Sequence, residues 1–220
     1  MKLVLIRHGQ TAANLSAALD TRLPGLPLTN LGQSQAQSLS ERFSKEVGDR
    51  LDALTVSAMT RTRQTAAPLC ARYGVKPQVS AQIREVSAGD YEMSSSPVAI
   101  RVYVEACYAW MNANFAHRMP GAEDGYEFLG RVVPIIRDVM ERAYRSGGDE
   151  GVGGIVAHGG LIRVLSAVLS EDIRLGVSPT QFMTNTGMAV FEANIDEFRR
   201  LRSGEVAYLK ALSWDGHQLG

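Results

Sequence analysis

Short apolar runs alternate with longer amphipathic stretches along most of this chain. Six apolar segments have the length expected of strands: 3–6, 54–56, 78–80, 154–157, 188–192 and 206–209. Amphipathic stretches predict three helices between them: 29–45, 60–73 and 161–169. Thr29 is the expected N-cap of the first helix, and Gly74 ends the second. This alternation predicts an α/β fold with a mainly parallel central sheet and helices on both faces.

The alternation stops between Val86 and Gly151. Two helices follow one another there with no strand between them: 97–117 and 126–145. We therefore expect a single domain over residues 1–220, in which residues 87–150 form an inserted helical cap lobe over the C-terminal edge of the strands.

Charge and cysteine content narrow the function classes. The chain has 220 residues with 23 Lys+Arg and 23 Asp+Glu, so it lacks the basic surplus expected of a protein that binds nucleic acid or an anionic membrane. No apolar run approaches the roughly 18 residues that span a bilayer. Cys70 and Cys107 form no Cys-x-x-Cys pair. We expect no nucleic-acid or membrane partner and a cytoplasmic location.

Two predicted strands end in the same way, with a histidine followed by a glycine, at His8 and His158. Ligands of an open parallel sheet bind at the carboxyl ends of its strands, so both histidines are expected in one crevice. Arg7 precedes the first histidine, and Arg61 follows a third strand end. The glycine after each histidine, Gly159 in the second case, lets a ligand approach the backbone. The helix N-termini beyond these glycines offer free N–H groups to an anion.

The nature of the ligand follows from the charges at these strand ends. Two histidines and a carboxylate could hold zinc. However, Arg7 beside His8, with Arg61 nearby, would repel a dication, whereas guanidinium groups suit phosphate oxygens. The chain has no Gly-x-x-x-x-Gly-Lys-[Ser/Thr] loop for a nucleotide. We therefore expect a small phosphoryl group, no metal and no cofactor.

A series of motifs supports this prediction. In chain order they are Arg7-His8-Gly9-Gln10-Thr11 with Asn14, Leu28 to Ala36, Ser57 to Ala66, Arg84-Glu85, and His158-Gly159-Gly160. Together they extend over residues 1 to about 165 and resemble the histidine phosphatase superfamily, the phosphoglycerate-mutase-like proteins, in its phosphatase branch.

The resemblance implies three catalytic residues. His8 would be the nucleophile and become phosphohistidine. Glu85 would be the general acid toward the leaving oxygen and then the base toward water. His158 would stabilise the charge of the transferred group.

The resemblance also implies a phosphate-binding set, made up of Arg7, Asn14, Arg61, His158 and Gly159. Donors of this kind stabilise the equatorial oxygens during phosphoryl transfer. We expect the partner of this site to be a small phosphorylated substrate. A homodimer is a further partner that the sequence allows.

The predicted function is a metal-independent phosphomonoesterase that acts through phosphohistidine on a small phosphorylated metabolite, a histidine acid phosphatase-like phosphoric monoester hydrolase. One alternative is a cofactor-dependent phosphoglycerate mutase. The lobe lacks the basic, proline-rich insert of those mutases, and Arg101, Arg118 and Arg131 are expected to be surface charges. Another alternative is a non-catalytic module that binds phosphorylated ligands on the same fold, although both His8 and Arg61 are present.

Overall fold

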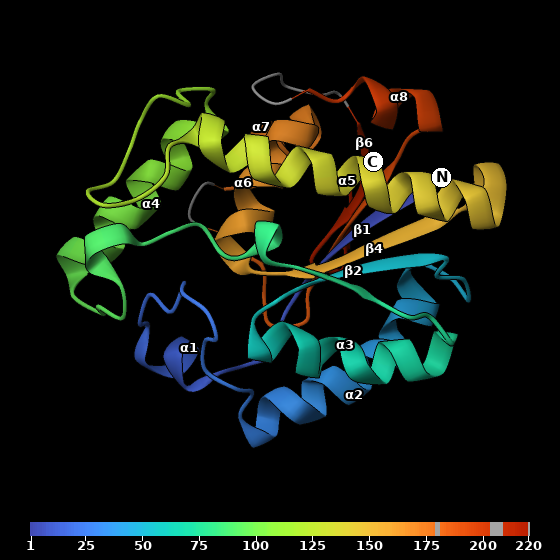
Figure 1. Ribbon diagram of the computed structural model, residues 1–220, viewed down its shortest axis with the longest axis horizontal. Helices are drawn as coiled ribbons and strands as arrows, with labels where there is room; N and C mark the ends of the chain where they lie inside the picture. The colour runs from blue at the N-terminus through green and yellow to red at the C-terminus, as the bar shows by residue number, and fades with distance from the viewer. Residues whose placement is uncertain (179–180, 203–208, 220) are drawn as a thin grey trace.

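The computed structural model describes residues 1–178, 181–202 and 209–219, and its centre is a seven-stranded mixed sheet (Figure 1). The strands are β1 Lys2–Arg7, β2 Ala53–Ser57, β3 Gln78–Ser80, β4 Val152–Ala157, β5 Met188–Glu192, β6 Lys210–Trp214 and β7 His217–Gln218. They lie in the order β3-β2-β4-β1-β5-β6-β7. The first four in this order are parallel, and β5, β6 and β7 pair antiparallel. The predicted α/β class and mostly parallel sheet are confirmed, with an antiparallel edge added.

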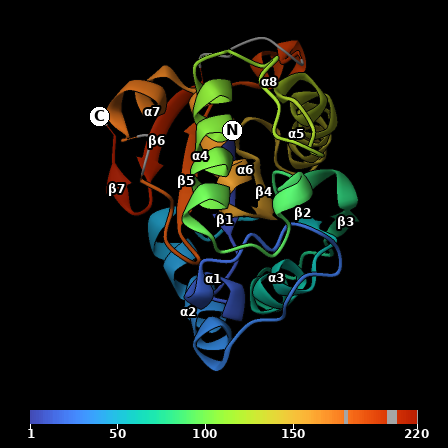
Figure 2. The ribbon, with the colours of Figure 1, turned by 90° about the vertical axis from the view of Figure 1, so that its left-hand side faces the viewer.

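Helices cover both faces of this sheet. They are α1 Ala12–Ser16, α2 Asn30–Glu46, α3 Thr60–Tyr73, α4 Pro97–Met111, α5 Gly125–Gly147, α6 Gly159–Leu169, α7 Glu171–Gly176 and α8 Ile195–Arg200. Short 3₁₀ turns occur at η1 Ala81–Ile83, η2 Gly89–Tyr91 and η3 Gly148–Glu150. In Figure 1, α2 and α3 lie below the sheet and α5 above it. Helix α4 packs against α6, farther from the strands (Figure 2).

The central strand β1 shows why the strands read as continuous apolar runs. Leu3 and Leu5 belong to the core cluster shared with α4, α5 and α6, whereas Val4 and Ile6 belong to the cluster under α2 and α3. All four side chains are fully buried. A strand covered on both faces needs apolar residues at every position, so the alternation of a one-sided strand is absent.

Several predicted boundaries differ from the structure. Helix α4 ends at Met111 instead of residue 117, because Asn112 leaves helical geometry and Ala113 has a positive φ of 62°. Most of the strand predicted at 206–209 lies outside the described residues, and the described strand β6 begins at Lys210. Helix α6 begins at Gly159, two residues earlier than predicted.

The segment predicted as an inserted lobe contributes to two layers. Helix α4 lies on α6, whereas α5 packs directly against β2 and β4. The division into one domain with a cap lobe over residues 87–150 stays a prediction. No helix in the described ranges combines the length and apolar character needed to cross a membrane.

Candidate active site

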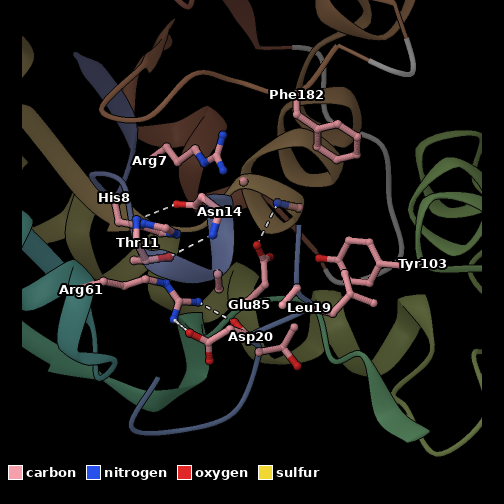
Figure 3. Close-up of a pocket in the computed structure, with 15 residues that line it drawn as sticks. Arg7, His8, Thr11, Asn14, Leu19, Asp20, Arg61, Glu85, Tyr103 and Phe182 are labelled. Carbon is pink, nitrogen blue, oxygen red and sulfur yellow. Dashed lines mark hydrogen bonds and ion pairs between the residues drawn. The ribbon is translucent and has the colours of Figure 1, made fainter. Parts of the chain in front are cut away.

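A cavity of about 150 Å³ lies at the carboxyl ends of β1, β2 and β4 (Figure 3). Its lining contains most of the residues predicted for the site: Arg7, His8, Asn14, Arg61, Glu85 and Gly159. His158 lies outside the lining but packs edge to face against His8, with ring centroids 5.4 Å apart. The topology therefore brings the two His-Gly strand ends together.

His8 follows the last residue of β1 and is 3 % exposed. Its Nδ1 atom lies 2.7 Å from the Gly9 carbonyl oxygen. Because a carbonyl only accepts hydrogen bonds, Nδ1 carries the proton and Nε2 keeps a lone pair. Burial, reinforced by the charges of Arg61 and Arg7, lowers the pKa of His8 well below its ordinary value. The ring is therefore neutral at physiological pH, as a nucleophile must be.

His158 occupies the matching position after β4 and is fully buried. Its Nε2 lies 2.8 Å from Ser57 Oγ, at the end of β2. A serine hydroxyl that donates to Nε2 leaves the proton of the neutral ring on Nδ1. Burial, followed by the charges of Arg61 and nearby groups, lowers the pKa of His158 well below its ordinary value. His158 can therefore act as a neutral donor.

Two arginines bring positive charge to the cavity. Arg7 donates through Nη1 to the Met183 carbonyl. Arg61 is buried, with its Nη1 3.1 Å from Asp20 Oδ2 and its Nη2 2.8 Å from the Asp20 carbonyl. Burial lowers the pKa of both guanidinium groups, and this is opposed chiefly by Glu85 at Arg7 and by Asp20 at Arg61. Guanidinium groups stay protonated in proteins, so both arginines keep their charge.

Three buried donors beside His8 are left unpaired. Within the described part of the chain, Arg7 Nε, Arg61 Nε and His158 Nδ1 have no hydrogen-bond partner. Such groups are uncommon in native proteins, and each indicates a missing partner or a functional role. Three donors drawn from three strand ends match an anion with several oxygens, such as a phosphoryl group.

Asn14 belongs to the short helix α1. Thr11 caps this helix, and the Asn14 side chain completes a capping box with it. Asn14 Oδ1 accepts from the Thr11 amide at 3.0 Å and from Asn185 Nδ2 at 3.2 Å. Because these bonds occupy the oxygen, the Asn14 NH₂ group is the part able to donate to a ligand.

Glu85 reaches the cavity from the segment after η1. Its carboxylate accepts from the backbone amides of Val86, Gly160 and Leu161 at 2.8, 3.0 and 2.7 Å. The last two amides belong to the first turn of α6, where N–H groups lack helical partners. The Tyr103 hydroxyl also bonds to this carboxylate, and burial raises the pKa of Tyr103 well above its ordinary value. Glu85 is thus fixed at the cavity wall.

The two glycines after His158 make this close packing feasible. A Cβ atom on Gly159 would lie 3.1 Å from Arg7 Nε, and one on Gly160 would lie 2.2 Å from the Tyr103 hydroxyl. The glycine sequence therefore permits Arg7 and Tyr103 to lie against the backbone at the start of α6.

The structure places four further residues at the site that the sequence analysis missed or misjudged. Asp20 and Tyr103 line the cavity, and Asn185 donates to both Asn14 and the His8 carbonyl. These residues belong to no recognisable motif. Arg131, predicted as a surface charge, has a side chain only 7 % exposed. It pairs with Glu123 and donates to backbone carbonyls over residues 82–85, which fixes the segment that carries the predicted acid.

The donor set of the site differs from that of a metal centre. Over residues 1–178, 181–202 and 209–219, no three His, Cys, Asp or Glu side chains form a group that could hold a metal ion. The free donor atoms around His8 are N–H groups, two of them on guanidinium side chains, which suit an anion instead.

The family is shown by comparison with known proteins. The model of the histidine phosphatase superfamily (branch 1) matches residues 3–205. The chain belongs to this superfamily. The family predicted from the motifs is confirmed, and so is its enzyme class, phosphoric monoester hydrolase.

Individual relatives are similar over different lengths. A glucosyl-3-phosphoglycerate phosphatase of Mycobacterium tuberculosis is 32 % identical over 174 residues, which cover 76 % of this chain and 74 % of that protein. A PE-PGRS family protein of the same species is 37 % identical over 107 residues, 48 % of this chain but only 18 % of that protein. A solved mycobacterial glucosyl-3-phosphoglycerate phosphatase with VO₃ has a TM-score of 0.74 at 23 % identity, over 97 % of this chain and 98 % of that one, which shows the fold.

Proposed function

We propose that this chain hydrolyses a small phosphomonoester without a metal, by way of a phosphohistidine on Nε2 of His8. The observation that carries the proposal is the arrangement of three unpaired buried donors beside a neutral histidine: Arg7 Nε, Arg61 Nε and His158 Nδ1. Donors arranged before the reaction stabilise the charge of a transferred phosphoryl group without reorganisation.

The proposed reaction has two steps. Nε2 of His8 attacks phosphorus, the bond to the ester oxygen breaks, and Glu85 gives its proton to the leaving alcohol. Water then attacks phosphorus, the phosphorus–nitrogen bond breaks, and Glu85 takes a proton from the water as phosphate leaves. During both steps Arg7, Arg61 and the Asn14 amide would hold the equatorial oxygens, and the Gly159 backbone lies beside Arg7.

Each residue of the proposal has a separate structural support. The Gly9 carbonyl fixes the tautomer of His8. Three backbone amides and Tyr103 fix the Glu85 carboxylate. Ser57 fixes the ring of His158. Rigid support of this kind keeps reacting groups in the geometry that the reaction needs.

A mutase is the second candidate, because it would share the first step and replace water with a substrate hydroxyl. The lining gives it less support. Among the described residues around the cavity, the cations are Arg7 and Arg61, and both lie beside His8. A second phosphate held for transfer would have no further cation in this lining.

The test is hydrolysis of p-nitrophenyl phosphate in excess chelator by the wild type, His8→Ala and His217→Ala. The last variant is the matched control, because His217 is exposed on β7. We expect the wild type and the control to turn over equally. His8→Ala should lose about 10⁴-fold or more in kcat, as removal of a nucleophile does.

Two results would contradict the proposal. Turnover that disappears with chelator would mean that a metal takes part. Equal turnover by His8→Ala and the wild type would mean that another group is the nucleophile.

A further inference from the structure

Resting on the proposed function, we infer that this site selects phosphomonoesters whose alcohol is uncharged and apolar beside the ester oxygen, and that Asp20 excludes a second anionic group. Three features carry the inference: the charges of the lining, the fixed position of Asp20, and the apolar side chains on the cavity wall away from His8.

The charges of the lining disfavour a second anionic group on the substrate. Among the described lining residues, Arg7 and Arg61 are the cations, and Asp20 and Glu85 are the carboxylates. A phosphoryl dianion takes up both positive charges. Glu85 carries the proton for the leaving alcohol when the substrate binds, so a substrate with another anionic group would meet the charge of Asp20. Like charges repel strongly where water is excluded.

Asp20 is also bound directly to the phosphate-binding machinery. Its side chain is 6 % exposed and lies against Arg61, whose Nη1 and Nη2 both bond to Asp20. The Leu26 amide donates to the same carboxylate oxygen at 2.8 Å. Among the described residues, Arg61 Nε is the guanidinium nitrogen without a partner, so it is the nitrogen most open to the phosphoryl group. A second anion on the substrate would have to displace Asp20 to reach the rest of the guanidinium.

The residues on each side of this carboxylate hold it in place. The Leu19 amide donates to the Ser94 carbonyl, and the Met93 amide donates to the Leu19 carbonyl, each at 3.0 Å. The Thr21 amide donates to Glu92 at 2.8 Å. These bonds connect the segment to a distant part of the chain, so a shift of the carboxylate would break several of them at once.

The cavity wall away from His8 is apolar. Figure 3 shows the rings of Tyr103 and Phe182 together with Leu19 on this side. The Tyr103 hydroxyl is bonded to Glu85, so its ring is the part that remains for a substrate. Apolar and aromatic walls bury apolar atoms of a ligand, whereas a few polar groups fix its orientation.

A neighbouring cleft is a competing location for a second anion. This cleft of about 700 Å³ shares Arg7 and Phe182 with the cavity and contains Arg42. Arg42 is paired with Glu46 at 3.0 Å and donates to Thr186 at 3.3 Å. An anion would have to displace this pair, so we expect no binding there. An Arg42 variant belongs in the test.

The test compares kcat/KM for three esters: benzyl phosphate, glycerol 3-phosphate and 3-phosphoglycerate. The last two share a carbon skeleton, and 3-phosphoglycerate has a carboxylate where glycerol 3-phosphate has a hydroxymethyl group. For the wild type we expect the highest kcat/KM with benzyl phosphate. The kcat/KM for 3-phosphoglycerate should be at least about tenfold lower than that for glycerol 3-phosphate.

Two substitutions separate the causes. Asp20→Asn should raise the ratio of kcat/KM for 3-phosphoglycerate to kcat/KM for glycerol 3-phosphate about tenfold. This prediction holds even if the substitution changes both rates together. Leu19→Ala should reduce severalfold the ratio of kcat/KM for benzyl phosphate to kcat/KM for glycerol 3-phosphate. Leu15→Ala is its matched control, because Leu15 is 69 % exposed on α1 and lies outside the cavity lining.

The inference is overturned if the wild type hydrolyses 3-phosphoglycerate as well as glycerol 3-phosphate. It is also overturned if Asp20→Asn leaves their ratio unchanged, or if Arg42→Gln selectively removes activity on 3-phosphoglycerate. If Asp20→Asn does not fold, the order of the three esters by kcat/KM in the wild type and the effect of Leu19→Ala still test the inference. If the wild type hydrolyses none of the three esters and forms no phosphohistidine, the proposed function is overturned, and this inference with it.

Discussion

The two His-Gly strand ends differ in the element that comes after them and in the group that holds the histidine. After β1 the chain enters a loop, and His8 bonds to the carbonyl of its own neighbour, Gly9. After β4 the chain enters α6 directly, and His158 bonds to Ser57 on another strand. Both rings are buried and both have a pKa well below the ordinary value.

This difference sets which nitrogen each ring presents. The Gly9 carbonyl forces the proton of His8 onto Nδ1 and leaves a lone pair on Nε2. The Ser57 hydroxyl can donate to His158, which leaves Nδ1 of that ring with a proton and no partner in the described residues. One dipeptide thus supplies a nucleophile at one strand end and a donor at the other, because the hydrogen-bond partner differs.

The largest effect that tests this comparison is expected from His158→Ala. Removing one donor to a developing charge costs about 10²–10³ in kcat, less than removal of the nucleophile. The variant should still form phosphohistidine on His8. Single-turnover kinetics with p-nitrophenyl phosphate measures both properties. A His158→Ala variant as inactive as His8→Ala, with no covalent intermediate, would mean that the two histidines do not have separate roles.

The next effect is on stability against pH. Both rings have a lowered pKa in the folded state, so the unfolded chain binds their protons first. Their contribution to stability is present above the unfolded pKa of about 6.5 and is lost as pH falls below it. Between pH 7 and pH 5, the free energy of unfolding should fall by about 2 kcal/mol for each of the two histidines.

Urea unfolding at both pH values, in a phosphate-free buffer, measures this loss. The free energy of unfolding differs between the two pH values, and His8→Asn should make this difference about 2 kcal/mol smaller. The control His217→Asn changes an exposed residue and should leave the difference as in the wild type. An unchanged difference in His8→Asn would show that His8 is not held neutral.

The smallest expected effect concerns the hydroxyl that distinguishes His158. Ser57→Ala leaves the buried ring without its Nε2 partner, so we expect about a tenfold loss in kcat, the cost of one hydrogen bond. Thr62→Val on α3 is a comparable control, because the Thr62 hydroxyl is also buried but donates to the backbone carbonyls of Ser57 and Met59 instead of to a histidine. Equal effects of the two substitutions on kcat would remove the assigned role of Ser57.

The strand ends could be predicted from the sequence because local signals mark them. A continuous apolar run followed by His-Gly defines both the strand and the position of its end, and the parallel-sheet rule then places these ends at one edge. Arg7, His8 and His158 are adjacent to such runs. Arg61 needed one further step, since it follows a strand by four residues.

The supporting contacts could not be predicted, because they join residues far apart along the chain. Asp20 meets Arg61 across 41 positions, and Asn185 meets Asn14 across 171. Arg131 looked like a surface charge because nothing near it in the sequence indicates that it donates to backbone carbonyls over residues 82–85, 46 to 49 positions away. Such pairings depend on tertiary packing and leave no periodic pattern.

The identity of the phosphorylated histidine tests the two assigned roles most directly. Rapid acid-free quenching of the enzyme with ³²P-labelled p-nitrophenyl phosphate, followed by peptide mapping, answers this question. We predict an acid-labile label on the peptide that contains His8, in the wild type and in His158→Ala, and no label in His8→Ala. Label on the peptide that contains His158, or turnover by the wild type with no labelled histidine, would contradict the roles assigned to these residues.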